Sequence, residues 1–414
     1  MLLTLLLLAF QEPAAPVEPA PSELRVKDLK AHIGFLASDE LEGRESGKRG
    51  GHLAADYVEN QFRRFGLEAI TEDGSYRIPF EVNGLTCYNV VGVVRGTDPE
   101  MRESFLAVGG HHDHAGVGGP GAMGFPGEIH NGADDNASGT SGVLELAQWY
   151  AANPAKHSII FMTFDAEERG LIGSRVLAEG DVLPKDRIMA MINLDMIGRV
   201  TDDFLFVGGL GTASELRKVL DPVFAASELE LELDDRGEAP SDNTSFFNVG
   251  IPSLFFFSHI HEDYHMPGDD ADKINYEGQL KVLQLVRTVI DRLDQEKELT
   301  FRDFGGMGMP SDFNERMSEH YRKIMERRNN KGRLGVRAGE EEGASGLRVE
   351  SVRAGSAAEE AGVEAGDLLV EVNGRPTPTL DDLRRALGGG MKGDEVTVVV
   401  ERRGERIEVK AKLH

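Results

Sequence analysis

Four apolar runs, each followed by acidic residues or histidines, constrain this chain more than any other feature of its sequence. The runs are rich in β-branched and aromatic residues, which is typical of buried strands. They are Ser104 to Gly110, His157 to Asp165, Met189 to Asp195 and Ile251 to Ser258. Helical patterns alternate with strand-like runs from Ser22 to about Arg292. This alternation predicts an α/β domain with a mostly parallel central sheet flanked by helices.

The polar residues fall where such a sheet builds its sites. His111 comes just after the first run, Glu167 and Glu168 follow the second, and Asp195 ends the third. A segment from His259 to His265 follows the fourth run. Because the carboxyl ends of parallel strands meet at one edge of an open sheet, we expect these side chains to gather there.

Their chemistry predicts a metal centre. The candidate ligands and their neighbours are His111, Asp113, Asp134, Asp135, Glu167, Glu168, Asp195 and His265. The chain has a single cysteine, so a thiolate site is excluded, and a mixed histidine and carboxylate set suits zinc, manganese or cobalt. The excess of carboxylates suits two metals that share a bridging ligand, an arrangement that hydrolyses amides by activating a water between the ions.

Five motifs carry this set in order: HHDH, GADDNASG, DAEERG, NLDMIG and DYHMPGDD. In this order they resemble the family that contains bacterial leucine-type aminopeptidases, glutamate carboxypeptidase II and animal glutaminyl cyclases. The resemblance spans roughly Leu36 to Ile290. It implies a zinc exopeptidase fold, two zinc ions per chain and hydrolysis of the N-terminal bond of peptide substrates.

The resemblance also implies a role for each ligand position. His111 and Asp195 would hold the first zinc ion, Glu168 and His265 the second, and Asp135 would bridge the two. Asp134 would support the bridging residue. The other histidines exceed what a two-metal site uses, so we expect none of them to be a ligand; they are His112, His114, His130, His259 and His261.

Three further residues receive roles by the same resemblance. Asp113 would orient the imidazole of His111 from behind. Glu167 would be the general base, taking a proton from the bridging water and delivering it to the leaving amine. Tyr264 would steady the developing oxyanion with its hydroxyl.

Other functions stay open on the same scaffold. A carboxypeptidase or a glutaminyl cyclase are the enzymatic alternatives, and a catalytically inactive binding protein is the third. The complete ligand set favours hydrolysis over a one-zinc cyclase. Arg169, Arg175 and Arg199 lie near the motifs and leave a carboxypeptidase possible, because a substrate carboxylate needs a basic partner.

The C-terminal part resembles a PDZ domain of the kind attached to secreted bacterial proteases. The resemblance rests on GRLGV, on the run ESVRAGSAAEEAGVEAGDLLVEVNGRP and on LDDLRRAL, and it implies a small mixed α+β barrel. The backbone N–H groups around Leu334, Gly335 and Val336 would bind the carboxylate of a peptide or of a protein C-terminus, with the peptide added as a strand. A packing module is the alternative.

The N-terminal apolar run and the net charge indicate where the protein is found and which partners it can have. The N-terminal run MLLTLLLLAF is too short to span a bilayer and reads as a secretory signal, which predicts a secreted or periplasmic protein; a membrane tether is expected only if the run stays uncleaved. A net charge of -26 argues against nucleic acid as a partner. We expect a signal peptide and spacer at 1–20, a peptidase domain at 21–295, a linker with a helix at 296–331 and a PDZ-like domain at 332–414.

Overall fold

The computed structural model describes residues 23–119, 122–123, 127–341, 343–387 and 390–414. The predicted signal peptide and spacer at 1–20 lie outside them. The helices are α1 (Val26–Leu36), α2 (Arg49–Phe65), α3 (Gly139–Ala152), α4 (Ile172–Glu179), α5 (Leu216–Ala225), α6 (Asn243–Phe247), α7 (Tyr276–Leu293), α8 (Phe313–Asn330), α9 (Ala357–Glu360) and α10 (Leu380–Ala386). Short helical turns cover η1 (Asp39–Arg44), η2 (Ala133–Ser138), η3 (Lys185–Arg187) and η4 (Ala271–Lys273). Within the described residues, no helix combines the length and the apolar character that crossing a membrane requires.

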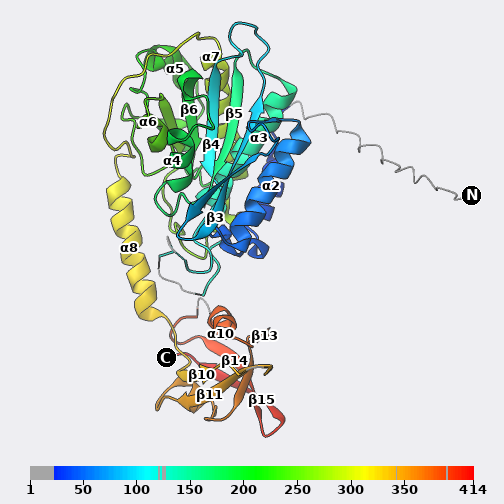
Figure 1. Ribbon diagram of the computed structural model, residues 1–414. Coiled ribbons are helices and arrows are strands. Elements are labelled where there is room, and N and C mark those ends of the chain that lie inside the picture. Colours follow the sequence, from blue (N-terminus) through cyan, green and yellow to red (C-terminus); the bar gives the residue numbers. More distant parts are fainter. Residues whose placement is uncertain (1–22, 120–121, 124–126, 342, 388–389) are drawn as a thin grey trace, which may run out of the picture.

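A nine-stranded sheet forms the centre of the larger unit (Figure 1). Its strands are β1 (Glu68–Ala69), β2 (Arg77–Val82), β3 (Leu85–Val94), β4 (Phe105–His111), β5 (Ser158–Phe164), β6 (Ile188–Leu194), β7 (Phe204–Gly208), β8 (Glu230–Leu233) and β9 (Ser253–Phe257). They lie in the order β1-β3-β5-β4-β6-β9-β7-β8, with β2 paired to β3.

The middle of this sheet is parallel, as the sequence predicts. Strands β5, β4, β6 and β9 are parallel neighbours, and they correspond to the four apolar runs. Every residue of these four strands is buried, because helices cover both faces and leave no polar side for alternating residues. Their carboxyl ends therefore open onto one edge of the sheet.

Most pairings outside this middle are antiparallel, although β7 and β8 pair in parallel, so the sheet is mixed rather than parallel throughout. β3 runs antiparallel to β1, β2 and β5, and β7 runs antiparallel to β9. β2 and β3 form a hairpin whose two-residue loop is Asn83 and Gly84, both with positive φ. An Asn-Gly pair between two strand-like runs favours a two-residue hairpin turn, because both turn positions need a positive φ.

Helices on both faces build the core. One large cluster packs side chains from α1, α2, α3, α5 and α7 against the sheet, and a smaller cluster packs α4 and α6 against its other face. In α2 the buried positions Ala54, Ala55, Val58 and Phe62 share one helix face, which is the amphipathic pattern that docks a helix on a sheet.

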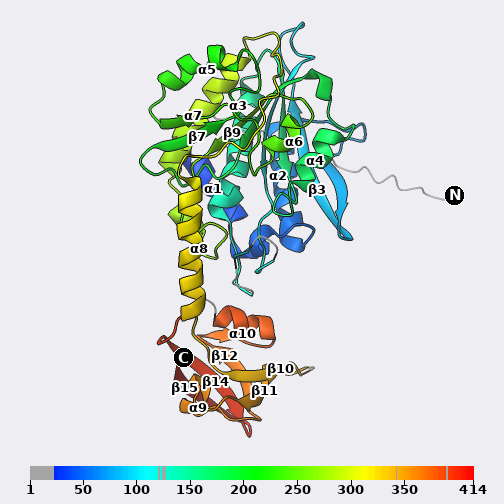
Figure 2. The same ribbon diagram turned by 90° about the vertical axis from the view of Figure 1, so that its left-hand side faces the viewer.

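A second, smaller unit follows helix α8 (Figure 2). Its strands are β10 (Val336–Gly339), β11 (Leu347–Val352), β12 (Leu368–Val372), β13 (Arg375–Pro376), β14 (Glu395–Arg402) and β15 (Glu405–Lys412). All their pairings are antiparallel, in the order β10-β11-β12-β14-β15 with β13 on β12. The unit has its own apolar core, to which α9 and α10 contribute. This matches the expected small α+β domain.

Candidate metal centre

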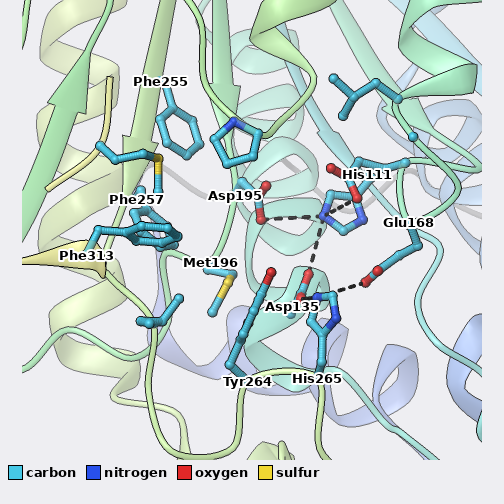
Figure 3. A pocket seen from close by; sticks show the side chains of 16 residues that line it. His111, Asp135, Glu168, Asp195, Met196, Phe255, Phe257, Tyr264, His265 and Phe313 are labelled. Carbon is cyan, nitrogen blue, oxygen red and sulfur yellow. Dashed lines mark ion pairs between the residues drawn. The ribbon is translucent and has the colours of Figure 1, made fainter. Parts of the chain in front are cut away.

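The residues predicted from the strand ends meet in one place. His111 is the last residue of β4, Asp195 directly follows β6, Glu167 and Glu168 follow β5, and His265 lies in the loop after β9. Together with Asp135, from the turn η2 that precedes α3, they line one cavity of about 310 Å³ (Figure 3).

The two oxygens of Asp135 face different groups of side chains. Oδ1 lies 3.4 Å from Nε2 of His111, which is also 3.4 Å from Oδ1 of Asp195. Oδ2 lies 2.9 Å from Nε2 of His265, which is 3.6 Å from Oε1 of Glu168. Asp135 therefore stands between two clusters of candidate ligands.

These clusters fit divalent metal ions on two grounds. Two ligands of one tetrahedral zinc ion, each about 2.0–2.1 Å from it, lie about 3.3–3.4 Å apart, and the His111 cluster shows this spacing. The cavity also concentrates the carboxylates of Asp135, Glu167, Glu168 and Asp195 in a buried place, where uncompensated negative charge is costly without a cation.

Electrostatics in the cluster point the same way. Burial alone would lower the pKa of His111, but the carboxylates of Glu167 and Asp195 hold this pKa well above its usual value. Burial would raise the pKa of Asp135, but His265 at hydrogen-bond distance keeps it below its usual value. The buried carboxylates thus favour positively charged groups at this place, and histidines supply that charge here.

His114 is the ligand-type residue that the sequence analysis set aside and that the structure places inside the site. Its Nδ1 lies 2.8 Å from Oε1 of Glu168 and 3.9 Å from Oδ2 of Asp135. The three residues form a compact group able to hold an ion. No sequence signal indicated this position, because a count of histidines against ligand positions does not say which of them face the cavity.

Asp113 is placed behind the site, but it holds more than the imidazole. Nδ1 of His111 lies 3.2 Å from the Asp113 main-chain oxygen and 3.7 Å from its carboxylate. The carboxylate accepts a hydrogen bond from the backbone N–H of Glu167 at 3.1 Å and from the hydroxyl of Ser46 at 2.7 Å. Asp113 therefore also positions the turn that carries Glu167.

Neighbouring polar side chains hold other candidate ligands in place. The Ser241 hydroxyl donates to Oδ2 of Asp195 at 2.6 Å. Asp269, fully buried, accepts the backbone N–H groups of Asp134 and Asp135 at 2.9 and 3.0 Å. Asp134 accepts the N–H of Gly198 at 2.6 Å, and its supporting role stays a prediction. The sequence indicated neither Ser241 nor Asp269 as part of the site.

Arg44 cross-links several backbone segments around the site through hydrogen bonds from its side chain. It is fully buried, and its guanidinium donates to carbonyl oxygens at distances from 2.5 to 3.3 Å. The acceptors are the carbonyls of Leu36, His112, Asn131, Gly132 and Asp135. One side chain thus joins the N-terminal helical segment to the loop beyond β4 and to the turn that carries Asp135.

Replacing this side chain is expected to destabilise the protein strongly. Arg44→Met keeps an apolar stem but leaves several buried carbonyls without donors, and each such loss costs about 1–3 kcal/mol. We expect the free energy of unfolding, measured with a chemical denaturant, to fall by at least about 3 kcal/mol. Arg49→Met, at an exposed arginine that also donates to a carbonyl, is the matched control; equal losses in both variants would contradict the role given to Arg44.

Glu167 and Tyr264 both line the cavity. Oε2 of Glu167 lies 4.0 Å from Nε2 of His111. Burial and the nearby carboxylates raise the pKa of Tyr264 well above its usual value, which keeps the hydroxyl protonated. In Figure 3 the ring of Tyr264 lies beside His265 and Asp135.

The predicted carboxylate-binding segment of the C-terminal unit has a suitable place. Leu334 packs into the core, Gly335 has a φ of +84°, and Val336 begins β10, which is an edge strand. An edge strand has room for an added strand, the mode of binding expected here. Capture of a peptide carboxylate by these N–H groups stays a prediction.

Comparison with known proteins identifies both units. Residues 89–290 match the model of peptidase family M28, and residues 348–402 match that of a PDZ domain. A probable zinc metalloprotease of Pyrenophora tritici-repentis is 28% identical over 207 residues, which cover 47% of this chain and 41% of that protein. The chain thus spans less than half the length of that relative.

Solved structures show the same fold. The aminopeptidase LapA of Legionella pneumophila superposes with a TM-score of 0.53 at 19% identity, covering 72% of this chain and 81% of that one. The glutaminyl cyclase of Porphyromonas gingivalis gives a TM-score of 0.52 at 17% identity, covering 65% and 99%. At these identities the likeness concerns the fold, which hosts more than one reaction. With its ordered ligand motifs at the strand ends, the chain carries a peptidase family M28 domain followed by a PDZ domain.

Proposed function

We propose that this protein is a zinc-dependent aminopeptidase with a two-ion centre. The observation that carries the proposal is the position of Asp135, whose two carboxylate oxygens face two separate clusters of ligands. Ions in two-metal sites lie about 3.5–4 Å apart, and a carboxylate in this position could bridge such a pair.

The proposed ligands divide between two positions. His111 and Asp195 complete the first with Asp135, and Glu168 and His265 complete the second. We add His114 to the second position because of its 2.8 Å contact with Glu168. Bound zinc would supply Lewis acidity and would lower the pKa of a water between the ions to about 7.

Glu167 is proposed as the general base. Its carboxylate lines the cavity beside His111 without belonging to the bridging set, so it is free to accept the proton of the attacking water. The same carboxylic acid then delivers this proton to the nitrogen of the leaving peptide. Tyr264 is proposed to donate its hydroxyl hydrogen to the oxyanion that develops on the scissile carbonyl.

The shape and charge of the cavity favour attack at a free N-terminus. A volume of about 310 Å³ is at the small end of ligand pockets and suits one residue and its peptide bond better than a long chain. Its carboxylates attract a substrate ammonium group. Of the described residues, the lining of this cavity includes none of the arginines that a carboxypeptidase would need, and Arg169 and Arg199 are paired with Glu45 and Asp263.

The test compares peptides with free and N-acetylated termini. We expect the full-length protein to release the first residue from the free peptide only, and a chelator to stop the release. Release from the other end of the acetylated peptide would indicate a carboxypeptidase. Conversion of an N-terminal glutamine to a ring without release of any residue would indicate a cyclase.

A further inference from the structure

The wall of the cavity opposite the metal ligands is apolar. Phe255, Phe257 and Ile260 come from β9 and the residues after it, and Met196 comes from the segment after β6. Figure 3 shows the aromatic rings of Phe255, Phe257 and Phe313 gathered on the side away from His111 and Glu168, with Met196 between them and the ligands. A substrate held by its peptide group at the ligands would therefore point its first side chain toward these rings.

Two residues of this wall come from the connector, the segment 296–331 that links the peptidase domain to the PDZ domain. Met309 and Phe313 line the cavity, and both lie beyond the segment 89–290 that matches the peptidase family. They also border a neighbouring cavity of about 460 Å³ together with Pro240. The wall is thus completed by a part of the chain that the peptidase motifs do not include.

The connector is docked, because α8 has one face with reduced exposure. Among its described side chains, only Phe313, Met317, His320 and Ile324 are not exposed. Spacings of four, three and four residues place them on a single stripe of a helix. Phe313 and Met317 pack against the cluster that contains Phe257, and Ile324 packs against Met266.

Polar contacts fix the ends of this stripe to the loop that carries His265. Nε2 of His259 lies 2.7 Å from Oδ1 of Asp312, just before the helix. Two turns later, Nε2 of His320 lies 2.8 Å from the main-chain oxygen of Tyr264, the neighbour of His265. The position of Phe313 in the wall is therefore determined by contacts on both sides of it.

We propose that Met309 and Phe313 determine the specificity of the enzyme, by closing the apolar end of the cavity around a bulky apolar side chain at the substrate N-terminus. The proposal rests on the aminopeptidase function proposed above. It makes the connector part of the active site, so that α8 joins the substrate wall directly to the PDZ domain (Figure 2).

The experiment uses full-length variants and two peptides that differ only in the first residue, phenylalanine or alanine. In Phe313→Ala we expect the ratio of kcat/KM for the phenylalanine peptide over the alanine peptide to fall by about 10-fold or more, since differences in apolar pocket contacts have effects of this size. Met309→Ala should lower the ratio less, and Phe313→Leu should retain most of it. Met317→Ala is the control, because Met317 packs on the same helix face without lining the cavity.

Calorimetric binding of free L-phenylalanine and L-alanine gives a second reading that needs no hydrolysis. Weaker binding of phenylalanine by Phe313→Ala, with alanine unchanged, would support the proposal. An unchanged kcat/KM ratio and unchanged affinities in folded Phe313→Ala protein would overturn it, as would an equal change in Met317→Ala. If the wild type cleaved neither peptide, the aminopeptidase function would fail, while calorimetry would still decide the role of the wall.

Discussion

Glu167→Gln is expected to lower kcat by about 10²–10⁴-fold, the usual contribution of a general base, without loss of zinc. Glutamine has the size and shape of glutamate but cannot accept the proton of the attacking water at neutral pH. Because Glu167 lies 4.0 Å from His111 and outside the bridging contacts of Asp135, its replacement should leave the ions in place. The measurement combines steady-state kinetics with zinc analysis of the same preparation.

Two controls give this result its meaning. Glu179→Gln, at an exposed position at the end of α4, should leave both kcat and zinc content unchanged. Glu168→Gln should lower the zinc content as well as kcat. A Glu167→Gln protein that keeps wild-type kcat would contradict the assignment, and one that loses zinc would make Glu167 a ligand instead.

Asp135→Ala is expected to remove both ions, whereas Asp195→Ala and Glu168→Ala should each weaken mainly one. The reason is the shared carboxylate: His111 contacts one of its oxygens and His265 the other. Zinc content after dialysis against a weak chelator measures the effect, with Asp272→Ala, an exposed aspartate in η4, as the control. Tight retention of one ion by Asp135→Ala would contradict bridging.

Thermal stability should follow zinc content in these variants. A ligand present at a thousand times its dissociation constant stabilises the native state by about 4 kcal/mol. Excess zinc should therefore raise the Tm of the wild type, and should raise that of Asp135→Ala much less. Equal zinc-dependent shifts in the two proteins would mean that the stabilising ions bind elsewhere.

The sequence predicted the parallel centre of the fold and the ligand positions because both depend on local pattern. A buried parallel strand appears in the sequence as a short apolar run, and the residue that follows it lies at the carboxyl end of the strand, where such sheets build their sites. The observed β4, β5, β6 and β9 agree with the predicted runs to within two residues at each end. His111, Glu168 and Asp195 could therefore be placed before their contacts were known.

What the sequence missed depends on contacts between distant segments. Arg44 serves the site through carbonyl oxygens as far away as Asp135, and a carbonyl has no sequence signature. His114 was excluded by a count, yet its direction is set by the loop after β4. The connector was expected to be a linker with a helix. Its docking face is visible in the sequence only as a stripe of three apolar residues and one histidine in a strongly charged helix.

The most direct test of the central claim is a zinc titration of metal-free protein, followed by release of the first residue from the free and acetylated peptides. The two-ion account predicts that release from the free peptide rises until two zinc ions are bound per chain, with none from the acetylated peptide. Full activity at one ion per chain, or release that needs no metal, would contradict it.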